Sequence, residues 1–291
     1  MKNFILLFSL FGLIQLSAQD EAVRIFNDTR IVNAQSADIL NKRQLDVRIG
    51  HRFGDLLGDR GGWSTFYGLE NASDVMIGAD YGLLNNLTIG GYRTKGGAGL
   101  SQLLNGTAKY RIIHQKEDVP ASFTVTAFGL LSVSTMQKSD SPEALNFFDD
   151  PTHRMSYAVQ LMLGKRLNDR VSIQVTPGFV HRNIVRFGDT NDTYTLGGAA
   201  RFQLSKVVGL IVDATLPLNG EQSPITRSAE SEFTLPLGVG VEFNTGGHIF
   251  QVNLTNARGM METDYIPNTT SDWLDGEFRL GFTISRLFNV R

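Results

Sequence analysis

The chain has 291 residues, with 27 lysines and arginines against 29 aspartates and glutamates, so its formal net charge at pH 7 is −2. This balance disfavours a nucleic-acid partner, because binding to a polyanion needs an excess of clustered basic residues. The sequence contains no cysteine, which excludes a disulfide framework and every metal or haem site that depends on cysteine.

The N-terminus has the three parts of a secretory signal peptide. A basic start, MKN, is followed by the apolar run FILLFSLFGLIQL and by the small residues of SAQ before Asp20. The apolar run is too short to cross a bilayer comfortably as a mature helix. We therefore predict a signal peptide at residues 1–19. No later stretch approaches the length of a membrane-spanning helix, so a mature chain in a membrane would have to cross it with strands.

Residues 20–42 form a predicted N-terminal arm, because they show no sustained hydrophobic period. Two placements are open for this arm. It could fold into a barrel lumen as a plug, with Arg24, Arg30 and Asp38 meeting charges of the wall. It could also hang in the periplasm and bind a partner.

From residue 43 onward the sequence alternates apolar and polar residues with the period of two that is typical of β-strands. In EFRLGFTISRLF, residues 277–288, apolar side chains take every second position from Phe278 to Ile284. No segment has the spacing of a long helix. We predict twelve strands, near residues 43–54, 73–84, 86–94, 103–114, 120–134, 154–167, 170–183, 193–204, 207–218, 233–244, 247–256 and 277–288.

The predicted connections alternate in length along the chain. Those after the second, fourth, sixth, eighth and tenth strands are short, whereas the others are long, polar, Gly-rich or Pro-containing. A β-sandwich gives no reason for this alternation, but tight periplasmic turns and long external loops are typical of outer-membrane barrels. The predicted fold is all-β: a closed antiparallel up-and-down transmembrane β-barrel of about twelve strands, spanning residues 43–291.

The two faces of the predicted strands differ in charge. One parity is mainly aliphatic and aromatic, and the other carries nearly all of the charged residues. Because a Lys or Arg that faces mid-bilayer lipid costs about 2–4 kcal/mol, we assign the charged parity to the lumen. The candidate pore-lining residues are Asp46, Arg48, Arg52, Asp80, Lys109, Arg111, Arg166, Arg182, Arg201, Asp213, Glu242 and Arg279. They could form a slightly positive constriction that favours anionic or zwitterionic solutes, or cross-strand ion pairs that hold the barrel rigid.

Three further stretches carry a resemblance to a known family: TRIVNAQSADIL before the first strand, VRIGHRFGD within it, and VTPGFVHRNIV in the middle of the chain. Together with a signal peptide ending in LSAQ, they resemble a family of Gram-negative outer-membrane β-barrels known as a membrane-bound domain of unknown function. The resemblance covers most of the mature chain. It implies the barrel fold and the outer-membrane location, and it implies no particular activity.

The leading functional prediction is a porin-like channel for small hydrophilic solutes. The alternative is a closed structural or partner-binding barrel in an outer-membrane complex. An outer-membrane phospholipase is a distant third, because His181 and Asn183 share the lipid-facing parity. No serine on an adjacent strand is clearly placed with them, so we predict no enzyme activity and no catalytic residue.

We also predict no cofactor and no metal site. Acidic loops such as METDY have no EF-hand spacing and are expected to be solvated, and the His-Arg pairs at His51 and His181 are expected to place Arg inside and His outside. The expected partners are outer-membrane lipid, the barrel-assembly machinery, which reads a terminal aromatic such as Phe288, and a periplasmic partner of residues 20–42.

Overall fold

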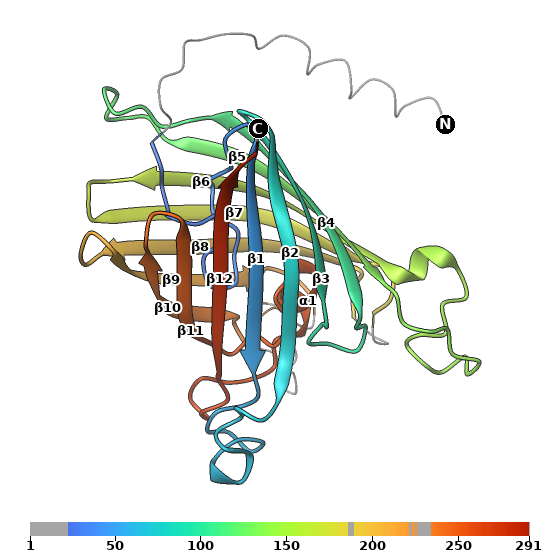
Figure 1. The fold of residues 1–291 in the computed structure, drawn as a ribbon. Helices are drawn as coiled ribbons and strands as arrows, with labels where there is room; N and C mark the ends of the chain where they lie inside the picture. The colour runs from blue at the N-terminus through green and yellow to red at the C-terminus, as the bar shows by residue number, and fades with distance from the viewer. Residues whose placement is uncertain (1–22, 186–188, 221–222, 224, 226–233, 291) are drawn as a thin grey trace, which may run out of the picture.

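In the computed structural model, twelve antiparallel strands form one closed barrel (Figure 1). The structure describes residues 23–185, 189–220, 223, 225 and 234–290, so the predicted signal peptide lies outside the described residues. The strands are β1 (Gln44–Phe53), β2 (Ala72–Leu84), β3 (Leu87–Thr94), β4 (Leu103–Ile113), β5 (Thr124–Ser134), β6 (Met155–Arg166), β7 (Val171–Arg182), β8 (Asp192–Gln203), β9 (Val208–Pro217), β10 (Leu237–Asn244), β11 (His248–Thr255) and β12 (Arg279–Asn289). Short 3-10 helices occupy Trp63–Thr65 and Pro151–Arg154, and one α-helix, α1, spans Glu262–Asn268.

The barrel closes where β12 pairs with β1. The register runs from Gln44 opposite Asn289 to Arg52 opposite Gly281, and every other strand pairs with its neighbours in the sequence. Closure leaves no edge strand with unpaired backbone groups, which is what a strand-based span of a membrane requires. The predicted twelve-stranded up-and-down barrel is confirmed.

The connections divide between the two ends of the barrel. The connections 85–86, 114–123, 167–170, 204–207 and 245–247 lie at the end where β1 begins and β12 ends, which we call the turn end. The loops 54–71, 95–102, 135–154 and 256–278 begin and end at the opposite end, which we call the loop end, where β7 also ends and β8 begins, and β9 ends and β10 begins. Two strands begin four residues later than predicted, β5 at Thr124 and β10 at Leu237. Pro120 and Pro236 precede them, and proline has no N–H to donate to a ladder.

The outer surface of the barrel is apolar and the inner surface is polar. Outward-facing side chains such as Val47, Ile77 and Val159 are exposed, and Ile77 shows 56% of its surface. Inward-facing side chains from the same strands, such as Arg48 and Asp74, are fully buried. A continuous apolar outer surface is unfavourable in water, so we assign it to contact with lipid. This distribution agrees with the predicted parity of the strands.

Replacing Ile77 by arginine tests this assignment. Ile77 faces outward in β2 and lies opposite Ile49 of β1, another exposed residue. We expect Ile77→Arg to reduce the unfolding free energy in lipid vesicles by about 2–4 kcal/mol, because arginine must leave water for hydrocarbon. The measurement is urea-induced unfolding in vesicles, with Ile77→Leu as the control. A variant as stable as the wild type would place this face outside the membrane.

The loop between β11 and β12 differs from its prediction. Met260, Met261, Glu262 and Asp264 are all buried, so the expectation that METDY is solvated is wrong. The apolar side chains of this stretch pack inside the barrel, and α1 contacts β5, β6, β7 and β9. The barrel offers an interior that the loop can fill, and burial of methionine and tyrosine surface favours the inward position. Among the described residues, no helix is both long enough and apolar enough to cross a membrane.

Candidate functional site

Residues 23–42 enter the barrel as a hairpin, which we call the lumen hairpin (Figure 1, blue trace). The Ile31 N–H donates to the Ala34 carbonyl at 2.8 Å, and the Ser36 N–H donates to the Thr29 carbonyl at 3.0 Å. The Val23 N–H donates at 3.4 Å to the carbonyl of Gln115, in the turn 114–123. Because residue 42 also leads directly into β1, both ends of the hairpin lie at the turn end, and its tip points towards the loop end.

Asp213 of β9 holds the tip of the hairpin. Its Oδ2 accepts from the backbone amides of Val32 at 2.7 Å, Asn33 at 2.7 Å and Ala34 at 3.1 Å, and its Oδ1 accepts from the Asn33 side-chain amide at 2.8 Å. Consecutive amides that converge on one carboxylate form an anion-binding nest. One wall carboxylate therefore satisfies the donors that a tight turn leaves without partners inside the barrel.

Arg48 of β1 binds the first limb of the hairpin. Its Nη1 donates to Asp28 Oδ2 at 2.8 Å, and its Nη2 donates to Asp28 Oδ1 and, at 2.8 Å, to Asp46 Oδ2. Burial opposes ionisation of Asp28, but the charge of Arg48 and its hydrogen bonds outweigh burial and lower the pKa of Asp28. The hairpin is thus joined to the wall by a buried ion pair.

Lys109 and Gln174 bind the hairpin through its backbone. The Lys109 ammonium donates to the Thr29 carbonyl at 2.5 Å and to the Ser36 carbonyl at 3.0 Å. The Gln174 side chain accepts from the Ala37 N–H at 2.7 Å and donates to the Gln35 carbonyl at 2.8 Å. All of these hydrogen bonds are made to backbone groups of the hairpin. They therefore depend on the conformation of the hairpin more than on its side chains.

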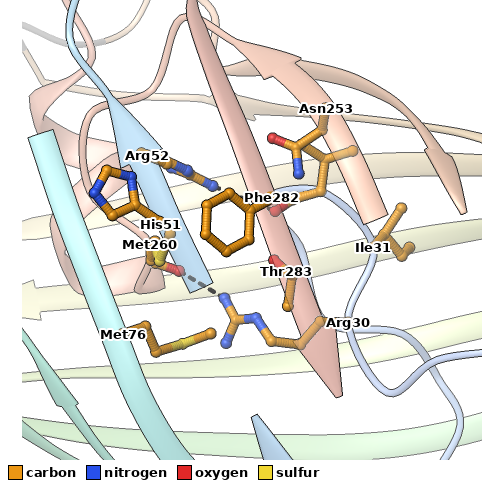
Figure 2. A pocket seen from close by; sticks show the side chains of 10 residues that line it. Arg30, Ile31, His51, Arg52, Met76, Asn253, Met260, Phe282 and Thr283 are labelled. Atoms are coloured by element: carbon orange, nitrogen blue, oxygen red, sulfur yellow. Dashed lines mark hydrogen bonds between the residues drawn. The ribbon is translucent and has the colours of Figure 1, made fainter. Parts of the chain in front are cut away.

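The first part of the loop 256–278, from Asn256 to Thr269, lies in the lumen and meets the hairpin, whereas Leu274 and Asp275 are exposed. The Arg30 Nη2 donates to the Met260 carbonyl at 2.6 Å (Figure 2). Arg52 of β1 donates to the Asn33 Oδ1 at 2.7 Å and also to the Gly259 carbonyl. Arg52 therefore joins the hairpin tip to the loop, and the two segments together form one continuous plug in the lumen.

Two buried carboxylates hold the inward loop in place. Asp74 of β2 accepts from the Met260 N–H at 2.9 Å and the Gly96 N–H at 2.9 Å. Asp264 of α1 accepts from the Gly97 N–H at 2.7 Å. Burial, followed by the nearby charge of Asp74, raises the pKa of Asp264 to about 7. The loops 95–102 and 256–278 are thereby tied to each other and to the wall.

Little space remains between these segments. A cavity of about 10 Å³ lies among Arg30, Arg52, Met260 and neighbouring side chains, which is about the space of one water molecule. Figure 2 shows these side chains converging from the hairpin, β1, β12 and the inward loop. A larger cavity of about 130 Å³ lies at the turn end. The described residues therefore occlude the middle of the lumen.

The model of the membrane bound beta barrel domain family (DUF5777) matches residues 26–288. The chain belongs to this family. This confirms the resemblance seen in the sequence, and the match includes most of the lumen hairpin as well as the barrel.

The solved structures include two similar chains, of which the first has a similar fold. An outer membrane channel from Pseudomonas putida F1 shares 13% identity, with a TM-score of 0.51 over 94% of this chain and 100% of that one. A KdgM porin shares 10% identity, with a TM-score of 0.49 over 84% of this chain and 99% of that one. No curated protein matches the sequence.

The structure places the predicted pore-lining residues on the lumen side, where their partners differ. Arg48, Arg52, Lys109, Asp213 and Glu242 contact the hairpin, and Glu242 accepts from the Asn27 side chain at 2.7 Å. The others bind loops, turns or the wall itself. Arg111 binds the Asn85 carbonyl, Arg166 binds Glu117, Arg182 binds Asp189, Arg279 binds the Asn256 carbonyl, Arg201 pairs with Glu242, Asp46 pairs with Arg48, and Asp80 lies opposite Asp46. That these residues line a path for solutes stays a prediction.

Both histidines of the His-Arg pairs lie on the outer side. The His51 ring lies 4.3 Å from the Phe53 ring, and the His181 ring stacks on Tyr157 at 4.8 Å. The two ring nitrogens of His181 lie 2.6 Å from Asp192 Oδ1 and 2.9 Å from Asn183 Oδ1. Both nitrogens are therefore engaged by these two side chains, and neither is directed at a serine.

Several residues of the site were not among the candidate pore-lining residues. Asp28, Asn33 and Gln251 bind across the lumen, and Glu262 and Asp264 lie inside the barrel. The apolar residues beside Glu262 in MMETDYI gave a signal for burial, since solvated loops rarely carry so many. For Asn33 no such signal exists, because its role depends on which wall residues surround it.

Proposed function

We propose that this protein is a gated outer-membrane channel for small hydrophilic solutes, which the lumen hairpin and the inward loop 256–278 keep closed. The outer-membrane location and the channel activity are supported by the similar fold of the channel from Pseudomonas putida F1. Its low identity supports the fold more than the function, so the main argument comes from the lumen itself.

The observation that carries the proposal is the polarity of the contact between the inner surface of the barrel and the lumen hairpin. Asp213, Arg48, Lys109 and Gln174 bind the hairpin through hydrogen bonds and one ion pair. Water can replace such partners when the hairpin leaves, whereas a purely apolar wall would strongly resist hydration. In a barrel that never opened, apolar side chains could fill the lumen, and fewer polar groups would then have to be desolvated. The polar inner surface of the barrel is thus suited to a lumen that fills with water when the hairpin leaves.

A closed barrel that binds a partner is the second candidate function. It is favoured by the continuous contacts that Arg30 and Arg52 make between the hairpin and the inward loop. The two candidates differ in whether the hairpin leaves the lumen.

A disulfide tether between hairpin and wall tests the gate. The natural chain has no cysteine, and Asn33 of the tip lies against Thr255 of β11, with Oγ1 to Oδ1 at 3.0 Å. In planar bilayers we expect urea to increase openings of the wild type, because urea weakens burial and backbone contacts. We expect the oxidised Asn33→Cys/Thr255→Cys variant to stay closed, and reductant to restore its openings.

Each single-cysteine variant serves as the control for loss of the Asn33 or Thr255 contacts. Deletion of residues 20–38 should raise the conductance, because it removes most of the hairpin from the lumen. If the wild type, the reduced double variant and the deletion variant all insert as folded barrels without current, the channel is excluded and the closed barrel is favoured.

A further inference from the structure

One contact of the lumen hairpin has the form of a ligand-binding site. The carboxylate of Asp28 receives both Nη groups of Arg48, in the two-pronged arrangement by which guanidinium groups recognise carboxylates. The side-chain amide of Gln251 donates to the same Asp28 Oδ2 at 3.2 Å. Arg48, Asp28 and Gln251 are all buried.

The donors of this site belong to the barrel and not to the hairpin. Arg48 lies on β1 and Gln251 on β11, the two strands that flank β12. Asp46, on the same strand as Arg48, accepts from its Nη2 at 2.8 Å and fixes its orientation. Withdrawal of the hairpin would leave Arg48 and Gln251 in place, with the guanidinium deprived of one of its two carboxylates. Arg48 without Asp28 is a partly buried charge that lacks one of its partners, so it favours binding of another anion.

A cavity at the turn end adjoins the site. The cavity of about 130 Å³ at that end is lined by Asp28 and Asp46, together with Arg24, Asn27, His248 and Ser285. A small solute in this cavity therefore lies beside the hairpin residue Asp28 without first crossing the middle of the lumen.

We propose that Arg48 and Gln251 form a binding site for the carboxylate group of a solute, and that Asp28 occupies it in the closed barrel as an internal substitute. This inference rests on the proposed gated channel, since it names the class of solute that the gate excludes. In the wild type, a solute carboxylate competes with Asp28 for Arg48 and so favours the state in which the hairpin has left the site. In a hairpin that lacks the Asp28 carboxylate, a small carboxylate takes the vacant place between Arg48 and the hairpin, so its binding there favours the closed state.

The surrounding charges favour a singly charged carboxylate over sulfate or phosphate. Asp46 shares Arg48 with the ligand position, and Asp80 lies opposite Asp46 in the β1–β2 ladder. A dianion would meet two acidic side chains close to one guanidinium, and repulsion between like charges is strong away from water. The planar pair of Nη donors also matches the two oxygens of a carboxylate.

The test is chemical rescue of Asp28→Ala by acetate. Arg30, only 5% exposed in the closed barrel, becomes a site for trypsin when the hairpin leaves, and mass spectrometry identifies the peptide that ends there. We expect Asp28→Ala to be cut faster than the wild type, because Arg48 has lost its partner. Acetate at about ten times its dissociation constant should slow this cleavage about tenfold, whereas acetamide and sulfate should not.

Two variants control the rescue. Asp38→Ala removes a hairpin carboxylate that accepts from the backbone amides of Ile25 and Phe26, and acetate should give it no comparable protection. Adding Arg48→Met to Asp28→Ala should abolish the effect of acetate. Absence of protection in Asp28→Ala, equal protection by sulfate, or protection that survives Arg48→Met would each overturn the carboxylate site.

Conductance separates this inference from the proposed channel. In planar bilayers, acetate should reduce the current through Asp28→Ala and leave that through Asp28→Ala/Arg48→Met unchanged. Protection by acetate without current in any variant would support the site and reject the channel. Current in Asp28→Ala with neither protection nor any change on adding acetate would support the channel and reject the site.

Discussion

Replacing Asp213 by alanine is expected to release the tip of the lumen hairpin and open the barrel. Asp213 accepts from three consecutive backbone amides and from the Asn33 side chain. Alanine would leave these donors buried without an acceptor, which costs on the order of 3–5 kcal/mol in the closed state. The open state loses nothing comparable, since water satisfies the same amides. Channel openings in planar bilayers should increase by at least about tenfold, because about 1.4 kcal/mol already corresponds to that factor.

Two variants give the comparison for Asp213→Ala. Asp213→Asn retains an oxygen that can accept from the tip, so its effect should be smaller. Asp118→Ala changes an exposed carboxylate in the turn 114–123 and should leave conductance unchanged. If Asp213→Ala folds but conducts no more than Asp118→Ala, then the hairpin tip does not control the gate.

The inward loop is expected to loosen as the pH rises from about 4 to about 7. Burial and the charge of Asp74 raise the pKa of Asp264 to about 7, from about 3.9 in an unfolded chain. A carboxyl with a raised pKa contributes fully to stability below about pH 4, and this contribution is lost as the pH rises through about 7. The loss is on the order of 4 kcal/mol. The temperature at which the folded barrel disappears from an unheated gel should therefore fall between pH 5 and pH 8.

Asp264→Asn isolates this effect. Asparagine keeps an oxygen for the Gly97 N–H but cannot ionise, so the variant should lose most of the fall in unfolding temperature. Asp275→Asn, at an exposed position of the same loop, should behave as the wild type does. A wild type whose stability does not change between pH 5 and pH 8, or an Asp264→Asn variant with the same fall, would exclude Asp264 as the titrating group.

The barrel could be predicted from local pattern, since alternation along each strand does not depend on distant parts of the chain. Phe282 and Ile284 face outward and Ser285 faces inward in β12, as the period of two requires. The same pattern placed Arg48 and Asp213 on the lumen side. The pattern failed where a proline delayed a strand, and in the loop around Met261, because no period marks a segment that is buried without being a strand.

The partners of the lumen residues could not be predicted in the same way. Asp213 and Val32 are 181 positions apart, and Arg30 reaches Met260 over 230. Such contacts depend on the register of the whole barrel and on the depth to which the hairpin enters. The sequence left open whether residues 20–42 plug the lumen or hang in the periplasm, so it could not assign partners to the charged residues of the wall. In the structure, the hairpin and the inward loop supply many of these partners.

The sequence by itself therefore determined the strands, their two faces and the closed barrel, because period-two alternation and the exclusion of charge from lipid are local properties of each strand. Only the tertiary structure decided that residues 23–42 and the first part of the loop 256–278, through Thr269, share the interior, and that Asp28 binds Arg48. Those contacts join segments that no local rule relates, and they form because a polar wall enclosed in the barrel must find hydrogen-bonding partners where water is excluded.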